Sequence, residues 1–503
     1  MSFLSFRSIA SVTLALSMGH AAHADLTAQN VWSDWQSQFE GFGNDVSATE
    51  TQSGDTLILN DLTISTPGSE EAAATRLQMG QVTFTENNDG TVSIALPDLM
   101  PFQMQIIGED GKPADIEMEI RQSGLVSTVS GVPTQMTNSY TAQSMDIVLT
   151  DLTLDGEKLS SETARFNLGL TDLAGSTTST VGGKRVMDQN MQASTVTYSL
   201  AFTDPEGGGD LQANGQMADI SFEGSSQSPL SKVASGDISA LLAAGMGGGG
   251  TFAYAAGASN MTVTENAAEV FSSTTTSTGG TLNVEFSPEG LAYSGDQNNL
   301  KLAMTSPDFP VPVDLDMVKS SFNLAVPVQK SEAAEDFALG FSLNDFSVSD
   351  TLWGLFDPSA QLPRNPATIA LDLTGKARVL ANIFDPALEE FEGPPAALET
   401  LDIKKLQITI AGAELTGEGA FRFDNNTPDA MPQPVGIADL SLVGGNKLID
   451  TLVAMGLLPE DQAMGARMMM GLLAAPGAQP DTLNSRIEIN AQGHVLANGQ
   501  RIQ

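Results

Sequence analysis

The sequence predicts a mainly β protein: one or more extended antiparallel sheets built of hairpins, a short N-terminal helix and a C-terminal methionine-rich helical pair. From Asp45 onward, apolar and polar residues alternate in runs of strand length. Short turns rich in Gly, Asn and Asp separate these runs, which indicates antiparallel pairing. Charged residues make up only 17% of the chain, and its many Ser, Thr and Gly residues favour sheet over helix.

The first residues have the pattern of a cleavable secretory signal peptide. Arg7 is followed by the apolar segment Ser8–Met18, within the usual length of about 7–15 residues, and by the small-x-small site Ala22–Ala24. The apolar segment is too short to span a bilayer, which requires about 20 residues. We therefore expect cleavage after Ala24 and an exported, soluble, periplasmic chain that begins at Asp25.

A short helix is expected at the start of the exported chain. Thr27 can cap it, and glycine at positions 41 and 43 can end it. Its tryptophans, Trp32 and Trp35, are expected to dock on a sheet, with contact to an apolar ligand as the alternative. Its apolar face recurs every four residues: Val31, Trp35 and Phe39.

Three hairpins follow in the sequence. Their turns are centred on Ser53–Asp55, Asn87–Gly90 and Glu109–Lys112. A Leu-x-Asp-apolar pattern recurs at Leu59–Ile64, Leu149–Leu154 and Leu343–Val348. It indicates either duplicated units or a β-bulge at the Asn/Thr-Asp pair, and the sequence leaves both open.

Composition divides the exported chain into an N-terminal β-rich half (25–224), a connector rich in Gly, Ser and Ala (225–251) and a C-terminal β-rich half (252–503). The C-terminal half includes a helical pair at 446–475, with Asn446 as the first cap and Pro459 in the first turn of the second helix. We expect its apolar face to pack over the strands 417–423 and 437–442 and to close one end of the sheet. Contact with a lipid or partner is the alternative. This face comprises Leu452, Met464, Met468 and Leu472.

Charge and residue content exclude several classes of function. A net charge of −39 argues against nucleic-acid binding, because phosphates are neutralised by Lys and Arg. The chain has no Cys, and His494 is the one His after residue 24, so triad and zinc chemistry have few candidates. We predict no catalytic residue, no metal ligand and no cofactor. The residues predicted to contact an apolar ligand are Trp32, Trp35, Met464, Met468 and Leu472.

Three stretches of the chain resemble the exported bacterial proteins grouped as domain of unknown function 2125. The first runs from Leu26 through Trp35 and continues at Ser53–Leu57. The second is Leu352–Pro358 with Leu362–Ala367. The third comprises Gly444–Asn446, Leu457–Pro459 and Ala497–Arg501. The resemblance implies an envelope protein of a Gram-negative bacterium and assigns no catalytic residue.

Together these features predict a non-enzymatic periplasmic envelope protein that binds a lipid-like or other apolar ligand, or acts as a scaffold with an envelope protein as its partner. A curved sheet with an apolar inner face would suit such a ligand. The alternatives are a carboxylate-dependent hydrolase of envelope glycans and a purely structural envelope component.

Overall fold

The computed structural model describes residues 25–41, 43–66, 68, 73–107, 112–204, 207–230, 238–385, 388, 391, 393–425 and 432–503. The predicted signal peptide, residues 1–24, lies outside the described residues, as does the middle of the predicted connector, residues 231–237. Within the described part, no helix is long and apolar enough to cross a membrane.

The chain forms a mainly antiparallel β structure with a few short helices, as predicted. The N-terminal part contains α1 (Ala28–Gly41), β1 (Asp45–Ser53), β2 (Thr56–Thr66), β3 (Ala74–Glu86), β4 (Val92–Ala95), β5 (Leu99–Ile107), β6 (Pro113–Ser123), β7 (Val126–Val132), β8 (Gln135–Leu154), β9 (Glu157–Leu159), β10 (Ala164–Val181), β11 (Arg185–Thr203) and β12 (Asp210–Ser228). The middle part contains α2 (Ile238–Ala243), β13 (Gly247–Tyr254), β14 (Ala256–Glu265), β15 (Ala268–Ser277), β16 (Gly280–Phe286), β17 (Leu291–Thr305), β18 (Val313–Val326), β19 (Glu335–Val348), α3 (Asp350–Trp353) and β20 (Ala367–Val379). The C-terminal part contains β21 (Ala396–Ile410), β22 (Ala413–Asp424), β23 (Gln433–Val443), α4 (Gly445–Ala454), α5 (Glu460–Leu473), β24 (Ala475–Pro476), β25 (Thr482–Ile489), β26 (Val495–Ala497) and β27 (Gln500–Arg501).

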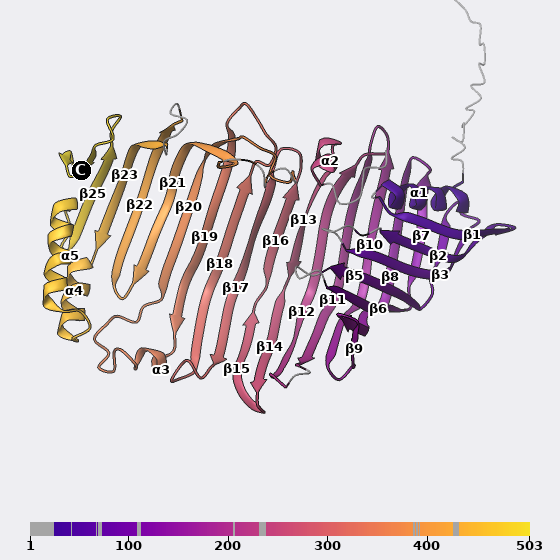
Figure 1. Cartoon of the computed structure of the whole chain (residues 1–503), viewed down its shortest axis with the longest axis horizontal. Coiled ribbons are helices and arrows are strands. Elements are labelled where there is room, and N and C mark those ends of the chain that lie inside the picture. The colour runs from indigo at the N-terminus through magenta and orange to yellow at the C-terminus, as the bar shows by residue number, and fades with distance from the viewer. Residues whose placement is uncertain are drawn as a thin grey trace, which may run out of the picture.

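All these strands belong to one sheet, which runs as a row of long strands from the indigo N-terminal end to the yellow C-terminal end (Figure 1). Most neighbours in the sheet are also neighbours in sequence. At several places in the described sheet, two shorter strands lie end to end along one longer strand. Near the N-terminus, β4 and β5 both pair with β3, and β6 and β7 both pair with β8. Further along, β13 and β14 both pair with β12, and β16 and β15 both pair with β17.

The N-terminal end of the sheet curls over itself and encloses α1. The main hydrophobic core lies inside this curl and joins side chains of α1 and β2–β5 to those of β7 and β8. Trp32 is buried at its centre, packs against Phe84, and donates an indole hydrogen bond of 2.7 Å to Glu50. The predicted helix and its Thr27 cap are confirmed, since the Thr27 hydroxyl accepts from the Asn30 N–H at 3.1 Å. The curl therefore builds one closed end of the molecule.

The recurring Leu-x-Asp pattern marks β-bulges. The strand register shifts within each of the segments Leu59–Ile64, Leu149–Leu154 and Leu343–Val348. Asp61 and Asp345 have φ values of 55° and 51°, which Asp tolerates better than most residues. The bulge interpretation is confirmed, and whether the units are duplicated stays a prediction.

The bulges allow apolar residues before and after the bulge to point to the same face of the sheet. In β2, Leu59 and Leu62 are three residues apart, yet both are fully buried. In a regular strand, residues three apart point to opposite faces. The extra residue restores the inward orientation, so one face stays apolar over the full strand.

The predicted connector is built partly of strand. Ser225–Ser228 form the end of β12, and Gly247–Gly250 form the start of β13, which pairs with it. The glycine run joins the sheet as a strand, because glycine can pair in a ladder wherever neighbouring backbone and rings supply the packing. The short helix α2 lies between these two strands in the sequence.

The C-terminal helical pair is confirmed, but its orientation is not the predicted one. Met464 and Met468 are 72% and 71% exposed, whereas Ala463 of the same helix is buried. The Ala463 side of α5 faces inward, and the helix contacts α4 and β25. Asp481 also replaces Asn446 as the cap of α4, since its carboxylate accepts from the N–H groups of Asn446 and Lys447.

Candidate functional site

One face of the sheet is apolar across nearly its whole width. We call it the inner face, because it carries the core residues at the N-terminal curl. Directly opposed residues of paired strands share a face. From β7 to β25 one such row contains no charged residue. It runs Val129, Asn138, Thr177, Gln189, Gly224, Gly250, Val284, Tyr293, Leu324, Leu339, Leu373, Ile403, Gly419, Ala438 and Ile487.

The middle of the inner face is uncovered. Its large apolar side chains from β16 to β19 are more than a third exposed: Leu282 39%, Tyr293 36%, Phe322 46%, Leu339 46% and Phe341 44%. Phe322 opposes Phe341 directly, so these rings form a continuous patch. Exposed apolar patches of this extent mark binding surfaces more often than inert ones. We name these five residues the apolar stripe.

The aromatic rings of the inner face lie low against the sheet because glycines stand beside them. A Cβ added to Gly295 would come within 3.0 Å of the Phe322 ring, and one added to Gly250 within 2.7 Å of the Phe222 ring. Both glycines therefore leave the space that the rings fill. At both positions the ring lies close to the backbone of the neighbouring strand.

A cavity of about 270 Å³ lies between α1 and the inner face. Trp35, Phe39 and other apolar side chains line it together with the polar side chains of Gln38, Asn138, Thr177 and Gln189. Trp35 thus lies where it can contact a ligand, while its ring also packs edge-on against Phe84, with 5.4 Å between ring centroids. Of the two tryptophans, only Trp35 reaches this cavity, because Trp32 is enclosed in the core.

A buried ion pair holds α1 beside this cavity. The Arg185 side chain is 3% exposed, and its Nη1 donates to Asp34 Oδ1 at 2.5 Å and to Ser179 Oγ at 2.6 Å. Asp34 lies on α1, whereas Arg185 begins β11, 151 residues later in the sequence. The pair fixes the helix over the sheet and neutralises the one charged residue in the cavity wall, Asp34.

The other predicted contact residues lie at the opposite end of the molecule. Met464, Met468 and Leu472 project into solvent from α5, with Leu472 49% exposed. The structure does not bring them together with Trp35, since α1 and α5 lie at opposite ends of the sheet (Figure 1). They form a separate exposed apolar surface. The apolar stripe between the two ends was not predicted from the sequence.

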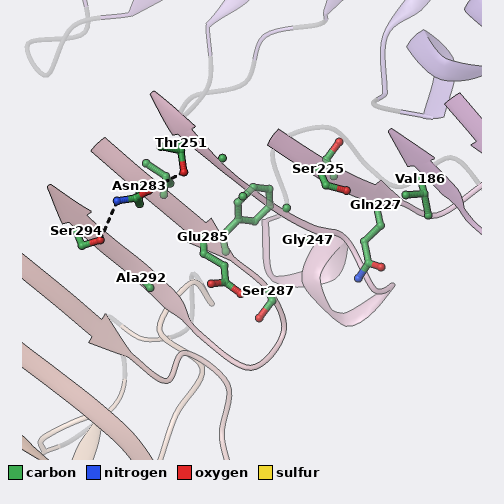
Figure 2. Close-up of a pocket in the computed structure, with 16 residues that line it drawn as sticks. Val186, Ser225, Gln227, Gly247, Thr251, Asn283, Glu285, Ser287, Ala292 and Ser294 are labelled. Carbon is green, nitrogen blue, oxygen red and sulfur yellow. Dashed lines mark hydrogen bonds between the residues drawn. The ribbon is translucent and has the colours of Figure 1, made fainter. Parts of the chain in front are cut away.

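Two larger hollows lie chiefly over the outer, polar side of the sheet. One has a volume of about 570 Å³ and is bordered by the glycine run of β13, where the absence of side chains leaves a trough (Figure 2). Thr251 donates to Asn283 at 2.6 Å along its border, and Asn283 donates to Ser294 at 3.4 Å. Glu285 is the one charged group in its wall.

A second hollow contains two facing carboxylates. Glu418 of β22 is directly opposite Asp439 of β23, and both line a space of about 570 Å³. The Asp439 carboxylate lies 3.5 Å from the Arg486 guanidinium, and its side chain is 49% exposed. A general acid needs an enclosed setting that raises its pKa, which this open position does not provide.

The carboxylates with lowered pKa values serve the fold. Asp357 is fully buried, and burial alone would raise its pKa. The N–H groups of Gln361 and Leu362 donate to it at 2.8 and 2.9 Å and, with nearby Arg364, hold the pKa below its ordinary value. Its loop contains the second family-like stretch. Among the described residues, no group of three or more His, Cys, Asp and Glu side chains could hold a metal ion.

Comparison with protein families gives a match in the C-terminal half of the chain. The model of a family described as "Uncharacterized protein conserved in bacteria (DUF2125)" matches residues 250–498. The matched range contains the Asp357 loop and the α4–α5 pair but not the N-terminal stretch with Trp32 and Trp35. It begins within β13 and includes all of the apolar stripe. No curated protein matches the sequence.

Proposed function

We propose that this chain, which belongs to the family of bacterial proteins of domain of unknown function 2125, is a non-enzymatic envelope protein of the periplasm. We further propose that it binds the acyl chains of lipids along its inner face. The observation that carries this proposal is the apolar stripe. Its five side chains lie side by side by strand register and stay uncovered in a chain of net charge −39.

The shape of the inner face favours acyl chains over a compact apolar ligand. The stripe crosses β16 to β19, and the apolar rows continue to β25. At about 4.8 Å per strand, the face between β11 and β25 is about 50 Å wide. Rings such as Phe322 lie close to the backbone of the neighbouring strand beside glycine. A long, thin and flexible molecule can follow such a surface and bury the exposed rings.

The experiment is to purify the exported chain from a bacterial envelope and to identify bound lipids by mass spectrometry after extraction. We expect acyl lipids in stoichiometric amounts and a monomer in solution. A lipid-free chain that forms a dimer with Phe341 protected would contradict the proposal and indicate that a second copy covers the stripe.

The hydrolase alternative would use Glu418 and Asp439, which face each other across two strands. It predicts that the purified chain cleaves envelope glycans and that Glu418→Gln abolishes the cleavage. The non-enzymatic proposal predicts no turnover by either form, together with unchanged lipid content in the Glu418→Gln variant.

A further inference from the structure

The cavity under α1 differs from the rest of the inner face in its polar lining. Asn138, Thr177 and Gln189 stand in one row on β8, β10 and β11, and Gln38 faces them from α1. Among the described residues, the side-chain amides of Gln38 and Gln189 have no hydrogen-bond partner. Asn138 accepts from Ser127 at 2.8 Å, which leaves its NH₂ group unused. Partly enclosed amides without partners favour a ligand that can hydrogen-bond with them.

The same row leads from this cavity to the apolar stripe. Gln189 is directly opposite Gly224, which is followed by Gly250, Val284 and Tyr293 on successive strands. The two glycines carry no side chain, and the Phe222 ring lies over them. A chain that starts at Gln189 therefore meets no polar or charged side chain in this row before it reaches Tyr293.

We infer that the cavity under α1 binds the polar head of an amphiphile whose acyl chain lies on the stripe, and that this head is uncharged and rich in hydroxyl groups. This inference rests on the proposed function. Amides supply both donors and acceptors, which matches hydroxyl groups. The neighbouring Arg185 is committed to Asp34 and Ser179, so it offers no free cation for an anionic head. The net charge of −39 on the chain also disfavours an anionic head.

The test compares two probes that share one acyl chain and differ in the head: monooleoylglycerol, which is neutral, and oleate, which is anionic. Binding to the delipidated exported chain is measured by calorimetry at pH 8 and below the micelle concentration of each probe. We expect monooleoylglycerol to bind about tenfold more tightly, as two or three additional hydrogen bonds would provide.

Two variants of one strand isolate the head site. Gln189→Leu should remove most of the preference for monooleoylglycerol and leave oleate binding unchanged. Gln192→Leu is the matched control, because Gln192 is exposed and points to the outer face, and it should preserve the preference. Thermal melts establish that both variants are folded.

The other possible results of these binding experiments distinguish a failure of the head-group assignment from a failure of the acyl-chain proposal. Equal affinity for the two probes, tighter binding of oleate, or a preference that survives Gln189→Leu would overturn the head-group assignment while leaving the acyl-chain proposal intact. Absence of binding by both probes would overturn the proposed function and this inference with it.

Discussion

Removal of the two exposed side chains in β19 should weaken acyl-chain binding without unfolding the protein. Leu339 and Phe341 are 46% and 44% exposed, and a bound chain would cover that surface. Full burial of such side chains contributes about 1.5–3 kcal/mol each. Their exposed shares therefore correspond to about 1.5–2.5 kcal/mol together, or a tenfold to sixtyfold weaker Kd for the Leu339→Ser/Phe341→Ser double variant.

A fluorescent acyl-chain probe titrated into the delipidated chain measures this effect. Val318→Ser is the control, since Val318 is 53% exposed and follows the buried Met317, so that it points to the outer face. We expect its Kd to equal that of the unsubstituted chain. Unchanged affinity in the double variant, or an equal loss in Val318→Ser, would refute the assignment of the binding surface to the inner face.

Three further predictions concern stability and are checked by thermal melts. Met468→Asp should lower the free energy of unfolding by less than about 0.5 kcal/mol, because that side chain is 71% exposed. Ala463→Asp should lower it by several kcal/mol, because it buries a charge. Similar losses in the two variants would contradict the outward orientation of the methionines. Asp34→Ala should destabilise the chain by about 3–5 kcal/mol because it leaves the Arg185 guanidinium buried and unpaired, and adding Arg185→Met should recover much of this loss. The lowered pKa of Asp357 stabilises the fold above the ordinary carboxyl pKa of about 3.9 and ceases to do so as the pH falls through its folded value. The Tm difference between the unsubstituted chain and Asp357→Asn should therefore shrink below about pH 4, and a constant difference from pH 7 to pH 3 would exclude this role.

The sequence predicted the features of the fold that depend on local signals. Thr27 caps α1 and the Gly-Asp turn at residues 54–55 joins β1 to β2 as expected, while Pro459 lies at the cap of α5, one position before the predicted first turn. The Asp61 and Asp345 bulges were signalled by their motif, because Asp adopts positive φ more readily than most residues. These signals act within a few residues, so no knowledge of the tertiary structure was needed.

The candidate site was harder to predict because it depends on contacts between distant segments. The ion pair between Asp34 and Arg185 joins residues 151 positions apart, and the sequence around either residue contains no local signal that predicts it. Helical spacing identified the methionines of α5 as one face but could not determine whether that face or the Ala463 side packs inward. The polar cavity is likewise formed by Gln38 and Gln189, which come together only when the sheet curls.

From β17 to β22 each strand pairs with the strand before it and the strand after it in sequence. Such an architecture is nearly one-dimensional, and its stability is approximately a sum of contributions from adjacent units. A hairpin can be gained or lost in this region without rethreading the rest of the chain. Each such event changes the width of the inner face by about 10 Å. If the inner face binds acyl chains as proposed, the number of hairpins in this region would set how long an acyl chain the protein can accommodate, and relatives of different length should differ in this limit.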